Sequence, residues 1–78
     1  MNKKYVILVK DKNNKIFYFE GISQTSIYPP MATFSPKIRH ASLFHSIVEA
    51  DKAWKRYLES SLSSPEYWKY VAIEEVKN

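Results

Sequence analysis

The chain has 78 residues and no cysteine, and its 12 Lys and Arg against 8 Asp and Glu give a formal net charge of +4. A chain of this length forms one small domain, here residues 1–78, and buries only about 60–65% of the surface that it exposes when unfolded. The absence of cysteine excludes disulfides, a thiolate nucleophile and zinc sites with cysteine ligands. It also fits a reducing compartment, so we expect a cytoplasmic protein.

The longest apolar run, residues 5–9, is too short to cross a bilayer. No cleavage-site pattern of small residues follows it, so we expect neither a membrane segment nor a signal peptide. The chain opens with Met1 and soon enters a strand pattern, so we expect a complete small gene product.

Residues 5–9, Tyr-Val-Ile-Leu-Val, form an apolar block between lysines, which is typical of a central strand covered on at least part of both faces. Residues 11–15 carry turn chemistry, because Asn tolerates positive φ and Asp can cap its own backbone. Residues 16–20 then return as a second strand, which completes a β-hairpin. Gly21, the only glycine, marks a bulge or the end of that strand.

The segment after the hairpin is less regular. Residues 23–30 include Pro29 and Pro30, which cannot donate ladder hydrogen bonds, so we expect a surface loop with Ile27, Tyr28 and Met31 near its tip. Residues 32–34 can add a short strand. Residues 35–37, Ser-Pro-Lys, are typical of the cap and first position of a helical turn. Residues 41–44 are expected to form an extended, strand-like segment that leads into the main helix.

A capping box begins the main helix, in which the Ser46 hydroxyl accepts from the Glu49 amide and the Glu49 carboxylate accepts from the Ser46 amide. Asp51 and Lys55 form an i, i+4 ion pair worth about 0.2–0.5 kcal/mol. Residues 63–65, Ser-Ser-Pro, end the helix. Apolar residues recur at spacings of three and four, so we expect one helix face against the sheet, made of Ile47, Ala50, Ala53, Trp54, Tyr57, Leu58 and Leu62.

Residues 70–76 predict a final strand, with Val71 and Ile73 on one face and Tyr70 and Ala72 on the other. The chain order is therefore strand, strand, a weaker strand, helix, strand. We expect an α+β domain with a three- to four-stranded, mainly antiparallel sheet and one amphipathic helix packed on one face.

The sequence does not predict catalysis. His40 and His45 flank an extended segment, and no cysteine or nearby carboxylate cluster supplies further metal ligands. A single glycine excludes the Gly-rich phosphate loops, and the one adjacent acidic pair, Glu74 and Glu75, faces opposite sides of a strand. We therefore expect no enzyme activity, no metal and no cofactor.

Binding remains, and basic residues are one set of candidates. Basic residues combined with aromatic ones are typical of single-strand nucleic-acid binders, and aromatic residues make up 15% of this chain. One basic group precedes the helix and another lies on the helix, and if the two fold side by side they form one positive patch. Otherwise the basic residues on the helix are an ordinary solvated face, balanced by Asp51 and Glu59. The basic candidates are Lys37, Arg39, His40, Lys52, Lys55 and Arg56.

Aromatic and apolar residues are the candidates for protein binding. Tyr28 and Met31 belong to a proline-stiffened loop of the kind that partners bind, or else that loop folds back over the hairpin. Tyr67 and Trp68 can form an aromatic anchor, because Trp and Tyr dominate interface hot spots, or else they cap one end of the core.

Two runs carry a resemblance to known proteins: residues 34–50, with Phe34, the Ala-Ser-Leu-Phe segment and the Ser-Ile-Val-Glu-Ala helix start, and the closing Val-Ala-Ile-Glu-Glu-Val at 71–76. Over about half its length the chain resembles a loose group of short, mostly uncharacterised accessory proteins of phages, prophages and mobile elements. Some small phage proteins of this build are stoichiometric inhibitors of host enzymes, anti-CRISPR proteins among them. The resemblance implies a non-catalytic protein that engages a protein partner, for example by inhibiting a host nucleic-acid enzyme such as a CRISPR effector, and it transfers no functional residue.

Two other functions stay open. The chain can be a small basic nucleic-acid-binding protein, or a homo-oligomeric structural module such as a homodimer. The second alternative follows from the exposed edge strand that a small sheet leaves.

Overall fold

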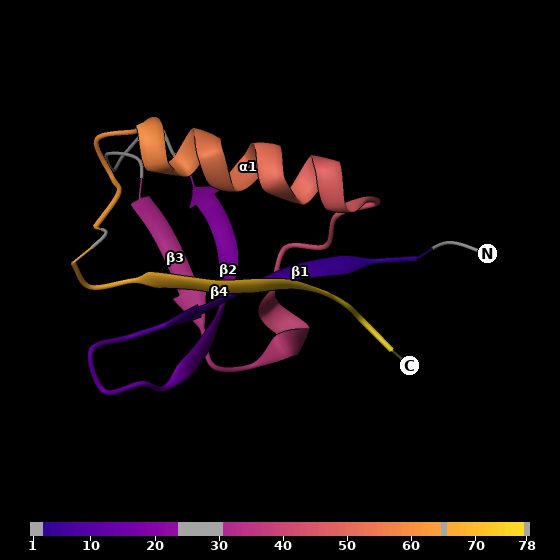
Figure 1. Cartoon of the computed structure of the whole chain (residues 1–78), viewed down its shortest axis with the longest axis horizontal. Coiled ribbons are helices and arrows are strands. Elements are labelled where there is room, and N and C mark those ends of the chain that lie inside the picture. The colour runs from indigo at the N-terminus through magenta and orange to yellow at the C-terminus, as the bar shows by residue number, and fades with distance from the viewer. Residues whose placement is uncertain (1–2, 24–30, 65, 78) are drawn as a thin grey trace.

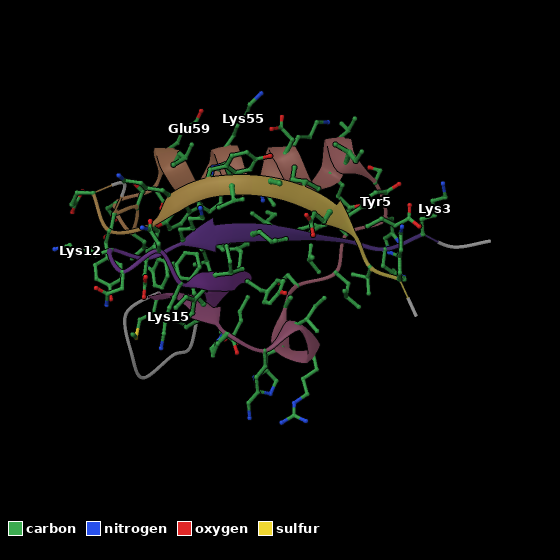
Figure 2. The ribbon with its side chains drawn as sticks, turned by 60° about the horizontal axis from the view of Figure 1, so that its bottom comes forward. Lys3, Tyr5, Lys12, Lys15, Lys55 and Glu59 are labelled. Atoms are coloured by element: carbon green, nitrogen blue, oxygen red, sulfur yellow. The ribbon has the colours of Figure 1, made fainter. Side chains whose placement is uncertain are left out.

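A computed structural model of the chain describes residues 3–23, 31–64 and 66–77. Its elements are β1 (Tyr5–Lys10), β2 (Ile16–Ser23), β3 (Met31–Ser35), the 3₁₀ helix η1 (Ile38–His40), α1 (Ile47–Glu59) and β4 (Lys69–Glu75). The strands form one antiparallel sheet in the order β3-β2-β1-β4, so β3 and β4 are its edges. Helix α1 covers one face of the sheet, and η1 lies on the opposite side (Figures 1 and 2). The predicted fold class is confirmed.

The predicted hairpin is formed by β1 and β2. Between them, the Asp11 carboxylate accepts from the backbone amides of Asn13 (2.8 Å) and Lys15 (2.9 Å), and Asn14 adopts a φ of 63°. Gly21 marks a bulge, because the register with β3 shifts just before it, and its φ of 117° favours glycine.

The core lies between α1 and the sheet. The Phe19 ring is near its centre, 5.8 Å from the Trp54 ring and 5.7 Å from the Tyr57 ring. As predicted for a central strand, β1 is buried from Val6 to Val9. The buried core cluster consists of Ile7, Val9, Phe19, Ala50, Trp54 and Tyr57.

The structure corrects the predicted extent of the helix. It ends at Glu59, because the Ser60 amide and hydroxyl both donate to the Tyr57 carbonyl (3.0 and 2.6 Å). Ser63 and Ser64 lie beyond the helix, and Pro65 is outside the described residues. Ile47 and Leu58 are exposed rather than in the core, since the helical repeat places them to one side of the buried stripe.

Half of the predicted capping box is present. The Ser46 hydroxyl accepts from the Glu49 amide at 3.1 Å. The Glu49 carboxylate, however, accepts from the His45 amide at 3.2 Å, not from that of Ser46. The predicted ion pair between Asp51 and Lys55 is confirmed at 3.0 Å.

The segment between β3 and α1 differs from its prediction in two respects. Ser35 is the last residue of β3 rather than a helix cap, and its hydroxyl accepts from the Lys37 amide at 3.1 Å. Residues 41–44 form no strand, because the segment meets β1 at one point only, where Phe44 exchanges backbone hydrogen bonds of 2.8 and 2.9 Å with Tyr5.

Strand β4 contains a bulge, and because of it the prediction that Tyr70 and Ala72 share one face of the sheet is wrong. Its register with β1 shifts between the partners Leu8 and Val9, which leaves Val71 as an extra residue. One extra residue reverses the alternation of side chains. Tyr70 therefore lies on the helix side of the sheet, where its ring is 5.9 Å from the Trp54 ring.

Candidate binding surfaces

The outer edge of β4 presents unpaired main-chain groups. The Val76 amide donates to the Lys4 carbonyl at 2.8 Å, and hydrogen-bonded and non-hydrogen-bonded pairs alternate along an antiparallel ladder. The amides and carbonyls of Ala72 and Glu74 therefore face β1, whereas those of Ile73 and Glu75 face outward. Within residues 3–23, 31–64 and 66–77, no strand pairs with this outward edge.

A shallow apolar groove of about 490 Å³ runs between this edge strand and the first turns of α1. Four of its large side chains are substantially exposed: Ile47 by 55%, Val48 by 64%, Tyr70 by 48% and Val71 by 38%. We call this surface the β4 groove, lined by Ile47, Val48, Asp51, Tyr70, Val71, Ala72 and Ile73.

The β4 groove contains one charged side chain, and that charge is paired. The Asp51 carboxylate lies 3.0 Å from the Lys55 ammonium, which points away from the sheet (Figure 2). Next to the groove, Glu75 lies 3.8 Å from the Lys3 ammonium. Because these charges are neutralised, apolar contact and the strand edge dominate what the groove can bind.

The two predicted basic groups do not form one patch. Lys52, Lys55 and Arg56 are on α1, whereas Lys37, Arg39 and His40 are in or beside η1, and the sheet lies between the two elements (Figures 1 and 2). His40 is also engaged locally, with its Nδ1 atom 3.2 Å from the Ser35 hydroxyl. The geometry required for a continuous basic surface is therefore absent from the described residues.

The aromatic and apolar candidates for protein binding also lie in different surroundings. Trp68 is half-buried, stacked 4.2 Å from the Phe34 ring and 5.1 Å from the Phe17 ring, so it caps one end of the core. Tyr67 is exposed. Its ring forms a T-shaped pair with the Trp68 ring, and the Lys12 ammonium lies 5.6 Å from its ring centroid. Met31 is exposed at the start of β3, and Tyr28 lies outside the described residues.

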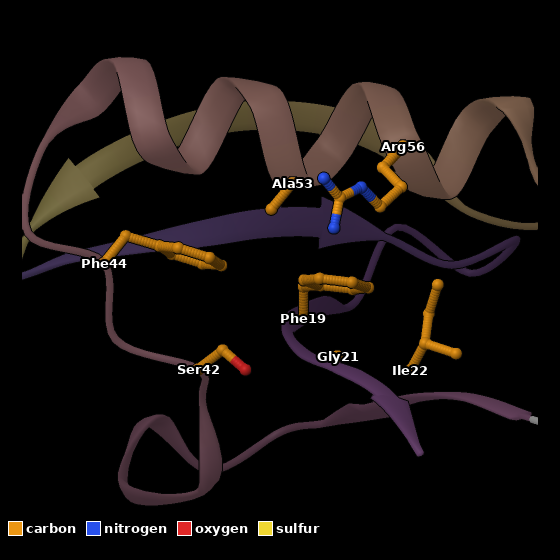
Figure 3. A pocket seen from close by; sticks show the side chains of 7 residues that line it. All are labelled: Phe19, Gly21, Ile22, Ser42, Phe44, Ala53 and Arg56. Atoms are coloured by element: carbon orange, nitrogen blue, oxygen red, sulfur yellow. The ribbon is translucent and has the colours of Figure 1, made fainter. Parts of the chain in front are cut away.

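A second, smaller cavity lies on the other side of α1, where the helix faces the end of β2 and residues 42–44. It measures about 250 Å³ and has one charged lining residue, Arg56 (Figure 3). We call it the Arg56 pocket, lined by Phe19, Gly21, Ile22, Ser42, Phe44, Ala53 and Arg56.

Most of the β4 groove was not predicted from the sequence. Ile47 was predicted to lie in the core, and Val48 was not named as a candidate. Val48 is an apolar residue outside the predicted helix stripe, and that position could have indicated an exposed apolar side chain. Val71 and Tyr70 carry no such signal, because their exposure depends on β4 being an edge strand and on its bulge.

The described residues contain no group of three or more His, Cys, Asp or Glu that could hold a metal ion. Nor does any helix within them have the length and apolar character needed to span a membrane. Comparison of the chain with protein-family models, with curated proteins and with solved structures finds no match.

Proposed function

We propose that this chain is a non-catalytic binding protein that engages a protein partner through the β4 groove and the outward edge of β4. In this proposal, an extended segment of the partner adds to β4 as a fifth strand and places apolar side chains in the groove. One observation carries the proposal: the outward main-chain groups of Ile73 and Glu75 lie beside a contiguous set of exposed apolar side chains.

Two effects combine at this surface. Main-chain hydrogen bonds to a bare edge supply affinity for any extended segment, and side-chain pockets beside the edge select its sequence. An uncovered edge strand also tends to pair with a further strand, which in this proposal comes from the partner. The sequence resemblance adds the class of partner, a host nucleic-acid enzyme such as a CRISPR effector.

The experiment uses a substitution that removes only an edge donor. Because the Glu75 amide faces away from β1, Glu75→Pro deletes an outward N–H without breaking a bond of the sheet. Glu75→Ala is the matched control, since it removes the same carboxylate and keeps the amide. Val48→Asp tests the groove, and Leu43→Asp tests a similarly exposed apolar residue outside it.

Affinity capture from nuclease-treated lysate of the cells that carry the gene then compares the variants. We expect wild type, Glu75→Ala and Leu43→Asp to retain the same partner, and Glu75→Pro and Val48→Asp to lose it. Capture that depends on intact nucleic acid would contradict the proposal. So would a wild-type dimer in light scattering that Glu75→Pro converts to a monomer, because the occupant of the edge would then be a second copy.

Direct nucleic-acid binding is tested separately by titrating a labelled oligonucleotide at two salt concentrations. Binding through several phosphate contacts gives a steep salt dependence. We expect no binding, because the basic residues of α1 and of the η1 segment are on opposite sides of the sheet. Salt-sensitive binding that is lost on neutralising Lys52 and Lys55 would favour the alternative function.

A further inference from the structure

The Arg56 pocket has the composition of a site for a small apolar acid. Two aromatic rings, Phe19 and Phe44, and the aliphatic Ile22 and Ala53 contribute its walls, and Arg56 is its one charged group. Figure 3 shows the guanidinium turned from α1 toward the space above the Phe19 ring. An apolar wall with a single convergent charged group is the usual composition of a small-molecule site.

Among residues 3–23, 31–64 and 66–77, no carboxylate pairs with the Arg56 guanidinium. All eight Asp and Glu lie in the described residues. The ion pairs among those residues join Lys3 to Glu75 and Lys55 to Asp51. Arg56 can therefore bind an external anion without first breaking an internal pair.

The wall opposite the helix is held by main-chain contacts. The Ser42 amide donates to the Phe19 carbonyl at 3.0 Å, and the Ser42 hydroxyl donates to the Glu20 carbonyl. Gly21 follows Glu20 at a φ of 117°, and a Cβ there would be 3.2 Å from the Ser42 hydroxyl oxygen. Phe19 is fixed from behind by the rings of Trp54 and Tyr57. This wall of the cavity is therefore held in place before any ligand binds.

We propose that the Arg56 pocket binds a single aromatic or branched apolar group that bears a carboxylate. The guanidinium donates two parallel hydrogen bonds to the carboxylate, a geometry that a lysine cannot supply. The apolar part lies against the partly exposed Phe44, Ile22 and Ala53, and Phe19, which is 3% exposed, forms the floor. A volume of about 250 Å³ is below the range for drug-sized ligands, so one ring with a short acid chain is the largest group that fits.

The site is independent of the β4 groove, since the two lie on different sides of α1 and share no lining residue. The same chemistry has two sources: a free small acid, or the C-terminal residue of a polypeptide. The probes that separate them are 3-phenylpropionate and the N-acetylated peptide Gly-Gly-Gly-Phe with a free C-terminus. Their neutral controls are 3-phenylpropionamide and the same peptide with an amidated C-terminus.

The measurement is an NMR titration that follows the backbone amides of Gly21, Ser42 and Ala53 in the full chain. We expect saturable shifts at these amides with a Kd on the order of 1 mM for the acid, as is usual for a ligand of one ring. The neutral amides bind at least about tenfold more weakly, because the charge-assisted pair is lost. Whichever acid binds more tightly, 3-phenylpropionate or the peptide, identifies the source.

Two variants of equal charge complete the test. Arg56→Gln weakens binding of the acid about tenfold, whereas Lys52→Gln, which removes one exposed cation from the same helix, changes it less than about twofold. Equal affinity for acid and amide would overturn the proposal, as would equal losses in the two variants. Absence of saturable shifts with both acids would overturn it as well.

Discussion

Replacing valine by threonine at two positions separates the core from the β4 groove. Val9 in β1 is 0% exposed, and Val48 in the first turn of α1 is 64% exposed. The change is the same at both sites, one methyl group for a hydroxyl of nearly the same size. Valine and threonine also have similar helix propensities and both favour strands. The two variants therefore differ mainly in the surroundings of the new hydroxyl.

The expected free energies of unfolding follow from burial. At Val9 the hydroxyl is enclosed among apolar side chains of the core cluster, and burying such a group without a new partner costs about 1–3 kcal/mol. At Val48 the hydroxyl stays in water, so the change is within about 0.5 kcal/mol. A core of this size supplies only about 3–5 kcal/mol in total, so Val9→Thr removes a large share of the stability.

Urea unfolding followed by tryptophan fluorescence and by circular dichroism measures both variants, since Trp54 is in the core. Val9→Thr lowers the midpoint and also lowers Tm by about 4–8 °C for each kcal/mol lost. A loss above about 1 kcal/mol for Val48→Thr would refute the reasoning, because the groove would then be covered in solution. A negligible loss for Val9→Thr would refute the description of β1 as a strand buried on both faces.

Three further substitutions test individual contacts. Ser46→Ala removes the α1 cap and costs about 0.5–2 kcal/mol by urea unfolding, and an unchanged midpoint would mean that the cap contributes nothing. Gly21→Ala costs about 1–3 kcal/mol, because alanine is strained at a φ of 117°; the loss persists in a Ser42→Ala background, and full rescue there would show that crowding alone is responsible. Tyr57→Phe costs about 1–2 kcal/mol and speeds exchange of the Ser64 amide, which donates to the Tyr57 hydroxyl at 3.0 Å; unchanged exchange would contradict that contact.

The elements that short-range chemistry determines were predictable from the sequence. Asp11 and Asn14 shape the hairpin turn through their own backbone preferences, and Ser46 caps a helix whose first residues follow it directly. The bulge at Gly21 also has a local cause, the left-handed backbone that glycine accepts. In each case the deciding contact spans only a few residues.

The surfaces were less predictable, because they depend on the arrangement of distant segments. The exposure of Ile47 depends on which helix face meets the sheet, and the side of Tyr70 on one extra residue at Val71. Trp68 is equally suited by composition to an interface anchor or to the core, and only its stacking on Phe34 assigns it to the core. The separation of the two basic groups likewise follows from the chain crossing the sheet between η1 and α1.

Amide hydrogen exchange along β4 tests the central claim, that this edge is open and receives a partner strand. In the free protein, we expect slow exchange for Ala72 and Glu74, which bond to β1, and fast exchange for Ile73 and Glu75, which face outward. When the captured partner is bound, Ile73 and Glu75 become protected too. Protection of all four amides in the free protein, or exchange at Ile73 and Glu75 that binding leaves unchanged, would contradict that claim.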